Sequence, residues 1–330
     1  MKKILCAIMA SCMLPCLCAC KAEEKPAETT QKTSVTSSLQ TEDPAKDDSL
    51  NVLFINNSTS YYFLDELYGV LTAAGYENVN LCLAYYSGCS LKQHYEFWQS
   101  KQAPYQFRIV NKNGINMTPN TDLDTALRAY NWDVIATACG GASLDSGDLQ
   151  TAYKADTEPY LGKILDYVQG LFPMSRYIWI QKWANDVGGV TGYAVKTVEQ
   201  RKAAQKILNE IAQLVKKNYG MEIAPCSDAW DKVRDLELFN TLPEGCPLEK
   251  FSMFSRLQDQ QVMDDHIHDG DIGGGQYLNA CVWFEVLTGE SCIGNTFRPK
   301  YTYQAWDWSL SEEKIDILQK AAHEAVAEIK

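Results

Sequence analysis

Three residues of this chain have the types needed for acyl-transfer chemistry. Ser58 follows the apolar run 51–55, and Asp265 and His268 stand about two hundred residues later in the spacing D-x-x-H. A serine, a histidine that takes its proton and a carboxylate that orients the histidine are the minimum parts for nucleophilic attack on a carbonyl. Residues this far apart in the sequence can act together only if the fold brings them into contact. We therefore expect the hydroxyl of Ser58 to lie beside the imidazole of His268.

Apolar runs alternate with helical patterns through residues 51–330. This alternation is typical of a mostly parallel sheet with helices on both faces. Asn113-Gly114 predicts a β-hairpin inserted near 105–118. We expect five parallel strands, at Val52–Ile55, Val79–Ala84, Val134–Ala138, Tyr177–Gln181 and Met221–Ala224, and helices near 61–74, 90–100, 121–130, 150–169, 198–217 and 310–329.

The first three predicted strands lead into residues that could form a site. Ser58 follows the first strand, Gly88 the second, and Gly140 and Gly141 the third. Ligands of such sheets bind at the carboxyl ends of the strands. We therefore expect these four residues to share one rim of the sheet.

The first twenty residues have the features of a secretory signal peptide. Lys2 and Lys3 precede an apolar stretch that is too short to span a bilayer. Residues 17–20, Leu-Cys-Ala-Cys, resemble the bacterial lipobox. The resemblance implies a signal peptide of residues 1–19 and a lipidated Cys20. We therefore expect an extracytoplasmic protein of the cell envelope, held to the membrane by a lipid anchor at Cys20.

The composition after the signal peptide separates a tether from a folded domain. Residues 20–50 have no aromatic residue and little that could be buried, so we expect a disordered tether before a single domain at 51–330. Removing residues 1–19 changes the formal charge from −12 to −14, because two lysines are lost. An acidic body argues against nucleic acid as a partner. The seven cysteines after residue 20 show no C-x-x-C pair, which argues against a zinc ribbon.

The motifs resemble those of the SGNH hydrolases, also called GDSL-type esterases, and more narrowly those of the bacterial group DUF4886. The resemblance covers most of residues 51–293, and it lies in the order and spacing of several short blocks rather than in any one of them. The matching blocks are Ile55 to Tyr62, Gly88 to His94, Trp132 to Ile135, Trp183-Ala184, Ala224 to Ala229, Asp265 to His268, Gly275 to Ala280 and Trp283 to Gly289.

The resemblance implies a fold and a mechanism. The fold would have three α/β/α layers, flavodoxin-like in outline, around a mostly parallel five-stranded sheet. Ser58 would attack an ester carbonyl, His268 would act as the base, and Asp265 would orient the imidazole. The oxyanion would accept hydrogen bonds from the backbone N–H groups of Ser58 and Gly88. The expected substrate is a small acyl ester, chiefly an acetyl ester of a carbohydrate.

Two positions depart from the family's pattern. Asn56 replaces a glycine, and we expect it to preserve a turn because asparagine tolerates a positive φ. The third block, residues 136–141, lacks the Asn or Gln of the family, so the N–H groups of Gly140 and Gly141 are the candidate substitutes. Asn185-Asp186 look like the missing pair but follow the fourth strand. A degenerate site would instead give a non-catalytic glycan- or ligand-binding lipoprotein.

Histidines and carboxylates near residue 268 leave a metal alternative open. His266 lies two residues from His268, so both rings would face one side of an extended segment. Imidazole and carboxylate groups together suit several divalent metals. The family match explains Asp265 and His268 without a metal, so we expect no cofactor. We expect His94 to lie on a helix surface. The other carboxylates nearby are Asp264, Asp269 and Asp271.

Overall fold

The computed structural model describes most of the chain after the proposed tether. The described residues are 49–138, 149–187, 195–258, 261–264, 267–303 and 306–329. Cys20, Cys139, Gly140, Gly141, Asp265 and His266 lie outside them. Among the helices of the described part, none is long and apolar enough to cross a membrane.

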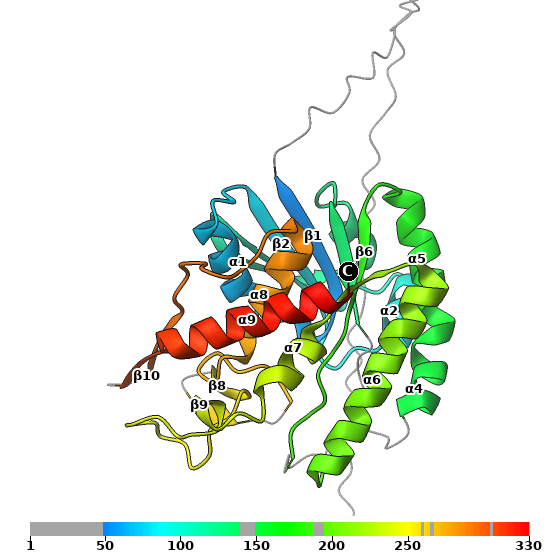
Figure 1. Cartoon of the computed structure of the whole chain (residues 1–330). Helices are drawn as coiled ribbons and strands as arrows, with labels where there is room; N and C mark the ends of the chain where they lie inside the picture. The colour runs from blue at the N-terminus through cyan, green and yellow to red at the C-terminus, as the bar shows by residue number, and fades with distance from the viewer. Residues whose placement is uncertain are drawn as a thin grey trace, which may run out of the picture. The chain divides into compact units, whose positions relative to one another are not determined.

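A seven-stranded sheet forms the centre of the fold (Figure 1). Its inner strands are short apolar runs that are mostly buried. Burial on both faces is typical of parallel sheets in α/β proteins. From one edge to the other the strands are β4 (Gly114–Thr121), β3 (Tyr105–Asn111), β2 (Val79–Tyr85), β1 (Leu50–Asn56), β5 (Val134–Thr137), β6 (Arg176–Ile180) and β7 (Glu222–Ala224).

The strands β2, β1, β5, β6 and β7 run parallel to one another, and they correspond to the five strands expected from the sequence. The expected number was wrong, because β3 and β4 add two antiparallel strands beyond β2. They form a hairpin whose turn is Lys112-Asn113, directly before Gly114 and within the segment where an insertion was expected. The hairpin pairs with the outer edge of β2, whose backbone N–H and C=O groups would otherwise be unpaired.

Helices cover both faces of the sheet, which confirms the three-layer α/β/α class (Figure 1). One face is covered by α1 (Leu64–Ala73), α7 (Cys226–Val233), α8 (Gly275–Thr288) and α9 (Glu312–Ile329). The other face is covered by α2 (Leu91–Gln99), α3 (Leu123–Leu127), α4 (Leu149–Asp156), α5 (Glu158–Leu171) and α6 (Val198–Tyr219).

Strand β1 shows how the sequence separates the two hydrophobic cores. Val52 and Phe54 point into the core beneath α1 and α8, while Leu53 and Ile55 point into the core beneath α5 and α6. Alternate residues of a strand face opposite sides of its sheet. A run in which every residue is apolar therefore predicts a central strand with helices on both sides.

The predicted set of helices needs two corrections. The segment 150–169 forms α4 and α5 rather than one helix, with a break at Thr157. Pro159 lies in the first turn of α5, where a proline is tolerated because its missing N–H would have no partner within the helix. Both α7 and α8 were missed. In α8 nearly every residue is buried, so its sequence has no polar face to reveal a helical period.

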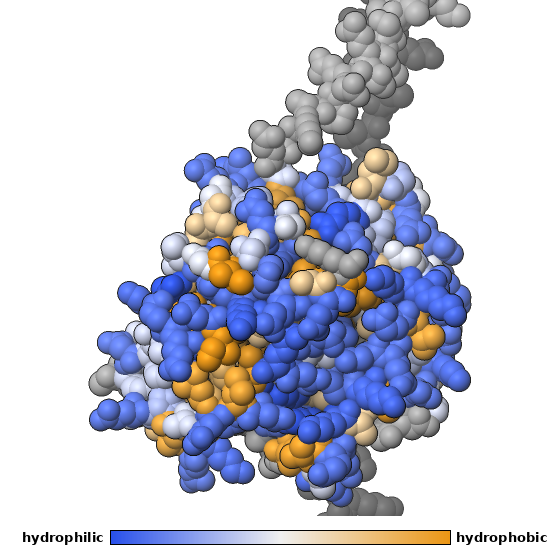
Figure 2. Space-filling model, viewed as in Figure 1, coloured by the Kyte–Doolittle hydropathy of each residue, from blue (hydrophilic) through white to orange (hydrophobic). Residues whose placement is uncertain are grey.

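Two small antiparallel sheets complete the described part. One contains β8 (Ser255–Gln258) and β9 (Gln261–Asp264), and the other contains β10 (Lys300–Tyr303) and β11 (Trp306–Ser309). The surface that faces the viewer in Figure 2 is mostly hydrophilic, with small apolar patches near α9. This agrees with the net charge of −12.

Candidate active site

Ser58 lies at the carboxyl end of β1, on a turn that a neighbouring side chain fixes. It begins a short 3₁₀ helix, Ser58–Ser60, whose N-cap is Asn57. Asn57 Oδ1 accepts a hydrogen bond from the backbone N–H of Thr59 at 2.9 Å, and its Nδ2 donates to the carbonyl of Cys89 at 2.9 Å. The second bond ties the turn of Ser58 to the loop that carries Gly88.

Asn56 does not take the positive φ that its place in the motif suggested. Among the described residues other than glycine, only Lys101 and Asn120 have a positive φ. Asn56 instead ends β1 in the interior, and its Nδ2 donates to Ser60 Oγ at 2.6 Å. The substituted amide thus braces the turn around Ser58 by a side-chain hydrogen bond rather than by a glycine-like backbone.

The structure brings His268 to Ser58. His268 Nε2 lies 2.8 Å from Ser58 Oγ, although 210 residues separate them. This distance is within the range of a serine–base hydrogen bond. Both residues are partly exposed, so a substrate could reach the hydroxyl. Asp265, the expected orienting carboxylate, is outside the described residues.

An aromatic ring lies beside the imidazole, and a cation lies over that ring. Tyr62 meets the His268 ring edge-on, with centroids 5.0 Å apart. On Tyr62 in turn lies the guanidinium of Arg256, 4.4 Å from the ring centroid, and Arg256 is buried. Tyr62 belongs to a sequence block of the family, but Arg256 carries no signal in the sequence because its position depends on the fold of β8.

Gly88, the second predicted oxyanion donor, lies in the loop that follows β2. Its φ of +62° is one that residues other than glycine rarely adopt. The following residue, Cys89, is the one bonded to Asn57, so Gly88 and Ser58 lie in two loops that touch. Gly140 and Gly141 are outside the described residues.

The third sequence block, at the end of β5, lacks the Asn or Gln side chain of the family, and none of its described residues, 136–138, supplies a substitute. Thr137, its last residue, donates its hydroxyl proton to the carbonyl of Ile55 at 2.8 Å in the interior. The Thr137 side chain is therefore directed at β1 rather than toward a substrate. Asp186, from the pair that imitates the missing motif, lies 3.6 Å from the guanidinium of Arg234, so it forms part of an ion pair.

His94 is buried rather than exposed on a helix surface as the sequence suggested. It lies in the first turns of α2, and its Nδ1 is 2.8 Å from the hydroxyl of Tyr105, with the two rings stacked. Burial lowers the pKa of His94 to about 3. A neutral His94 thus supports the end of the loop that carries Gly88.

Replacing His94 by glutamine should flatten the acid side of the stability profile. The unfolded chain protonates this histidine below about pH 6.5, whereas the folded protein resists protonation until about pH 3. The unfolded state binds more protons in that window, so this histidine's contribution to stability falls as pH falls, by up to about 1.4 kcal/mol per pH unit. Urea unfolding of both proteins between pH 7 and pH 4 measures the difference.

The pKa values of the carboxyl groups of Glu66 and Asp271 are raised by burial, so they contribute with the opposite sign. They are present in both proteins and cancel in the comparison. Parallel profiles for His94→Gln and the wild-type chain would contradict the buried neutral histidine.

A metal centre finds no support within the described ranges. No group of three or more His, Cys, Asp or Glu residues there could hold a metal ion. His266, on which the metal alternative depends, is outside those ranges.

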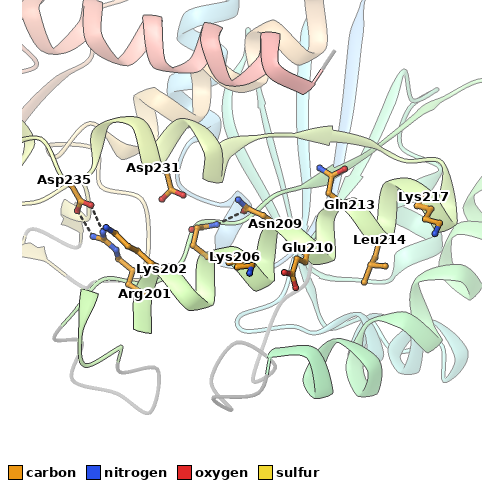
Figure 3. Close-up of a pocket in the computed structure, with 11 residues that line it drawn as sticks. Arg201, Lys202, Lys206, Asn209, Glu210, Gln213, Leu214, Lys217, Asp231 and Asp235 are labelled. Atoms are coloured by element: carbon orange, nitrogen blue, oxygen red, sulfur yellow. Dashed lines mark hydrogen bonds and ion pairs between the residues drawn. The ribbon is translucent and has the colours of Figure 1, made fainter. Parts of the chain in front are cut away.

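A separate cavity of about 900 Å³ lies along α6 and α7 (Figure 3). Its walls carry charges of both signs, and Arg201 at one end pairs with Asp235. None of the described residues at the Ser58 site lines it. The lining residues are Arg201, Lys202, Gln205, Lys206, Asn209, Glu210, Gln213, Leu214, Lys217, Asp231 and Asp235.

Comparison with known proteins agrees with the motif analysis. The model of a family described as "Domain of unknown function (DUF4886)" matches residues 51–325. A crystal structure of a DUF4886 family protein from Bacteroides uniformis ATCC 8492 is 22% identical, with a TM-score of 0.64. The match covers 84% of this chain and 95% of that chain. No curated protein is similar enough to be matched.

Two other solved structures are similar at lower scores. A protein from Slackia heliotrinireducens described as a putative SGNH hydrolase is 16% identical, covers 72% of this chain and 98% of its own, and has a TM-score of 0.42. The acetylxylan esterase Axe2 from Geobacillus stearothermophilus is 12% identical, covers 73% and 95%, and has a TM-score of 0.45. The Bacteroides protein shows a shared fold, and the lower scores add nothing to that conclusion.

Proposed function

The chain belongs to the DUF4886 family, and we propose that it is a serine esterase that removes acetyl or other small acyl groups. The observation that carries the proposal is the 2.8 Å contact between Ser58 Oγ and His268 Nε2. A serine hydroxyl is a weak nucleophile on its own and needs a base within this reach. The contact joins two motifs that are 210 residues apart in the sequence.

The proposed reaction has two stages. Ser58 Oγ attacks the ester carbonyl as its proton passes to His268 Nε2, and the carbonyl electrons move to the oxygen. When this oxyanion collapses, the C–O bond of the alcohol breaks and His268 returns the proton to the leaving oxygen. A water molecule then repeats the sequence on the acyl-serine, which releases the carboxylic acid and regenerates Ser58.

The remaining roles are those that the sequence motifs predict. Asp265 would hold the imidazole in the tautomer that accepts the serine proton. Backbone N–H groups of Ser58 and Gly88 would stabilise the oxyanion, and Gly140 and Gly141 are the candidate further donors. Losing one such donor typically costs about 3 kcal/mol of transition-state stabilisation.

The proposed alcohol is a carbohydrate. Tyr62 packs beside His268, and Tyr86 lies exposed two residues before Gly88. Aromatic faces near a nucleophile suit the apolar faces of sugar rings. Hydrolysis of chromogenic acetate, butyrate and octanoate esters and of an acetylated oligosaccharide by the full chain tests this. A rate that rises with acyl length would remove the small-acyl proposal.

A second candidate is a non-catalytic glycan- or ligand-binding lipoprotein on the same scaffold. One observation favours this candidate. The third block has no amide side chain, and its Thr137 hydroxyl donates to the Ile55 carbonyl rather than facing a substrate. This candidate predicts binding of glycans without turnover. Equal hydrolysis by the wild-type chain and by Ser58→Ala would leave it as the better account.

We also propose that a lipid on Cys20 anchors the protein to the membrane in the cell envelope, on the extracytoplasmic side. Growth with an alkyne fatty acid should label the wild-type chain but not Cys20→Ser, which has no acceptor for the acyl chains. The matched control is Cys18→Ser, which should remain labelled and in the membrane fraction. Label retained in Cys20→Ser would refute the anchor.

A further inference from the structure

A buried indole holds the residue that precedes His268. Trp183 follows β6, and its Nε1–H donates to the carbonyl of Ile267 at 3.1 Å. The Trp183 side chain is 1% exposed. Its hydrogen bond connects the segment after β6 to the peptide unit between Ile267 and His268.

A second buried chain of contacts holds the residue that follows His268. Trp230 of α7 stacks on Trp183, with centroids 4.9 Å apart and planes 7° apart. Trp230 Nε1–H donates to Asn279 Oδ1 at 2.9 Å, and Asn279 Nδ2 donates to Asp269 Oδ2 at 2.9 Å. Trp230, Asn279 and Asp269 are fully buried.

These two sets of contacts hold the residues directly before and directly after His268. One ends on the carbonyl of Ile267 and the other on the carboxyl of Asp269, and the stacked indoles join them. Gln276 of α8 adds a bond from its Nε2 to the Asp269 carbonyl at 3.0 Å. Hydrogen bonds in a water-free interior are stronger than exposed ones and fix geometry more tightly.

We propose that Trp183 is a positioning residue, whose hydrogen bond to Ile267 keeps the His268 imidazole within bonding distance of Ser58. The inference rests on the proposed esterase function. A catalytic group displaced by about 1 Å can lose as much as a hundredfold in rate, because the proton transfer needs the heavy atoms in line. Positioning affects the chemical step and leaves substrate binding nearly unchanged.

The chain contains a matched control for the loss of an indole donor. Trp308 Nε1–H donates to the carbonyl of Ile272 at 2.9 Å, in the same loop but four residues beyond His268. Trp308→Phe therefore removes the same kind of hydrogen bond from the same loop. A merely structural role for Trp183 predicts equal effects of the two substitutions on turnover.

The experiment compares Trp183→Phe, Trp308→Phe and the wild-type full chain on a chromogenic acetate ester, well below their unfolding temperatures. Phenylalanine keeps the stacking on Trp230 and removes the donor. We expect kcat of Trp183→Phe to fall about tenfold with KM within about twofold, and kcat of Trp308→Phe to stay within about twofold of wild type. Labelling of Ser58 by a fluorophosphonate should slow in the same order.

Equal kcat values for the two variants, or a Trp183→Phe variant that changes only KM, would overturn the positioning role. If Trp183→Phe does not fold, Gln276→Met decides, because it removes only the bond to the Asp269 carbonyl on the other side of His268. A fall in its kcat of about threefold or more at unchanged KM supports positioning, and a wild-type kcat refutes it. A wild-type chain that neither hydrolyses esters nor labels at Ser58 removes the proposed function itself, and the inference with it.

Discussion

Ser58→Ala should lower kcat for acetate ester hydrolysis by at least about a thousandfold, with little change in KM. The substitution removes the atom that forms the acyl intermediate, while the backbone N–H groups around it remain. His268→Ala should lose a similar factor, because the hydroxyl is then without its base at 2.8 Å. The double variant should be no worse than either single variant, since the two groups act as one unit.

The measurement is initial-rate kinetics together with mass spectrometry of the acyl-enzyme. A matched control lies elsewhere in the molecule, where Ser291 Oγ is 3.3 Å from His323 Nδ1. Glu285 Oε1 lies 3.1 Å from the same nitrogen, so serine and carboxylate share one atom of the ring. A relay needs them on opposite nitrogens. Ser291→Ala should therefore hydrolyse esters at the wild-type rate.

Two outcomes would contradict the assignment. Activity retained in Ser58→Ala would assign the observed hydrolysis to another group or to a contaminant. Additive losses in the double variant would show that Ser58 and His268 act independently, which their contact does not allow.

Gly270→Ala should destabilise the fold by about 3 kcal/mol, which is near the upper end for overpacking a buried site. A Cβ at this position would lie 2.0 Å from the backbone oxygen of Ser255 and 2.6 Å from its carbonyl carbon. Backbone atoms of Ser255 cannot rotate away as a long side chain could, and the N–H of Gly270 is also bonded to the Met253 carbonyl at 2.9 Å. The two segments must separate to admit a methyl group.

The same substitution should impair turnover, because Gly270 lies two residues after His268. Urea unfolding and ester hydrolysis of the variant measure the two effects. Gly170→Ala is the control: it lies near the end of α5, where an added Cβ would meet nothing within 4 Å, so its stability should change by no more than about 1 kcal/mol. Equal stability of the two variants would show that the loop before α8 is loosely packed.

The sequence predicted those parts of the fold that depend on local pattern. All five parallel strands were placed because their residues are apolar on both faces, as Val52 to Ile55 are. Helix α6 lies close to its predicted range of 198–217, and in the structure Thr197 caps its start and Gly220 caps its end. In contrast, α8 was missed because a helix buried on every side has no amphipathic period. The hairpin of β3 and β4 was predicted, but its pairing with the edge of β2 was not, because a local turn signal does not say which strand a hairpin joins.

The site was predicted only as far as its motifs reach. Ser58 and His268 were named from their blocks, and their contact required the fold to be seen. Trp183 and Asn279 also stand in family blocks, yet nothing in those blocks states that both connect to residues beside His268. Such contacts depend on the packing of β6, α7 and α8, which no local pattern encodes.

The amide of Asn57 has a consequence for how substrates enter. Because the side chain of Asn57 bridges the turn that carries Ser58 and the loop after β2, we expect these two segments to move as one unit. Any shift of that loop to admit a bulky alcohol carries the nucleophile with it and leaves their relative placement unchanged. The site must then adapt to leaving alcohols of different size through movement of the loop that carries His268.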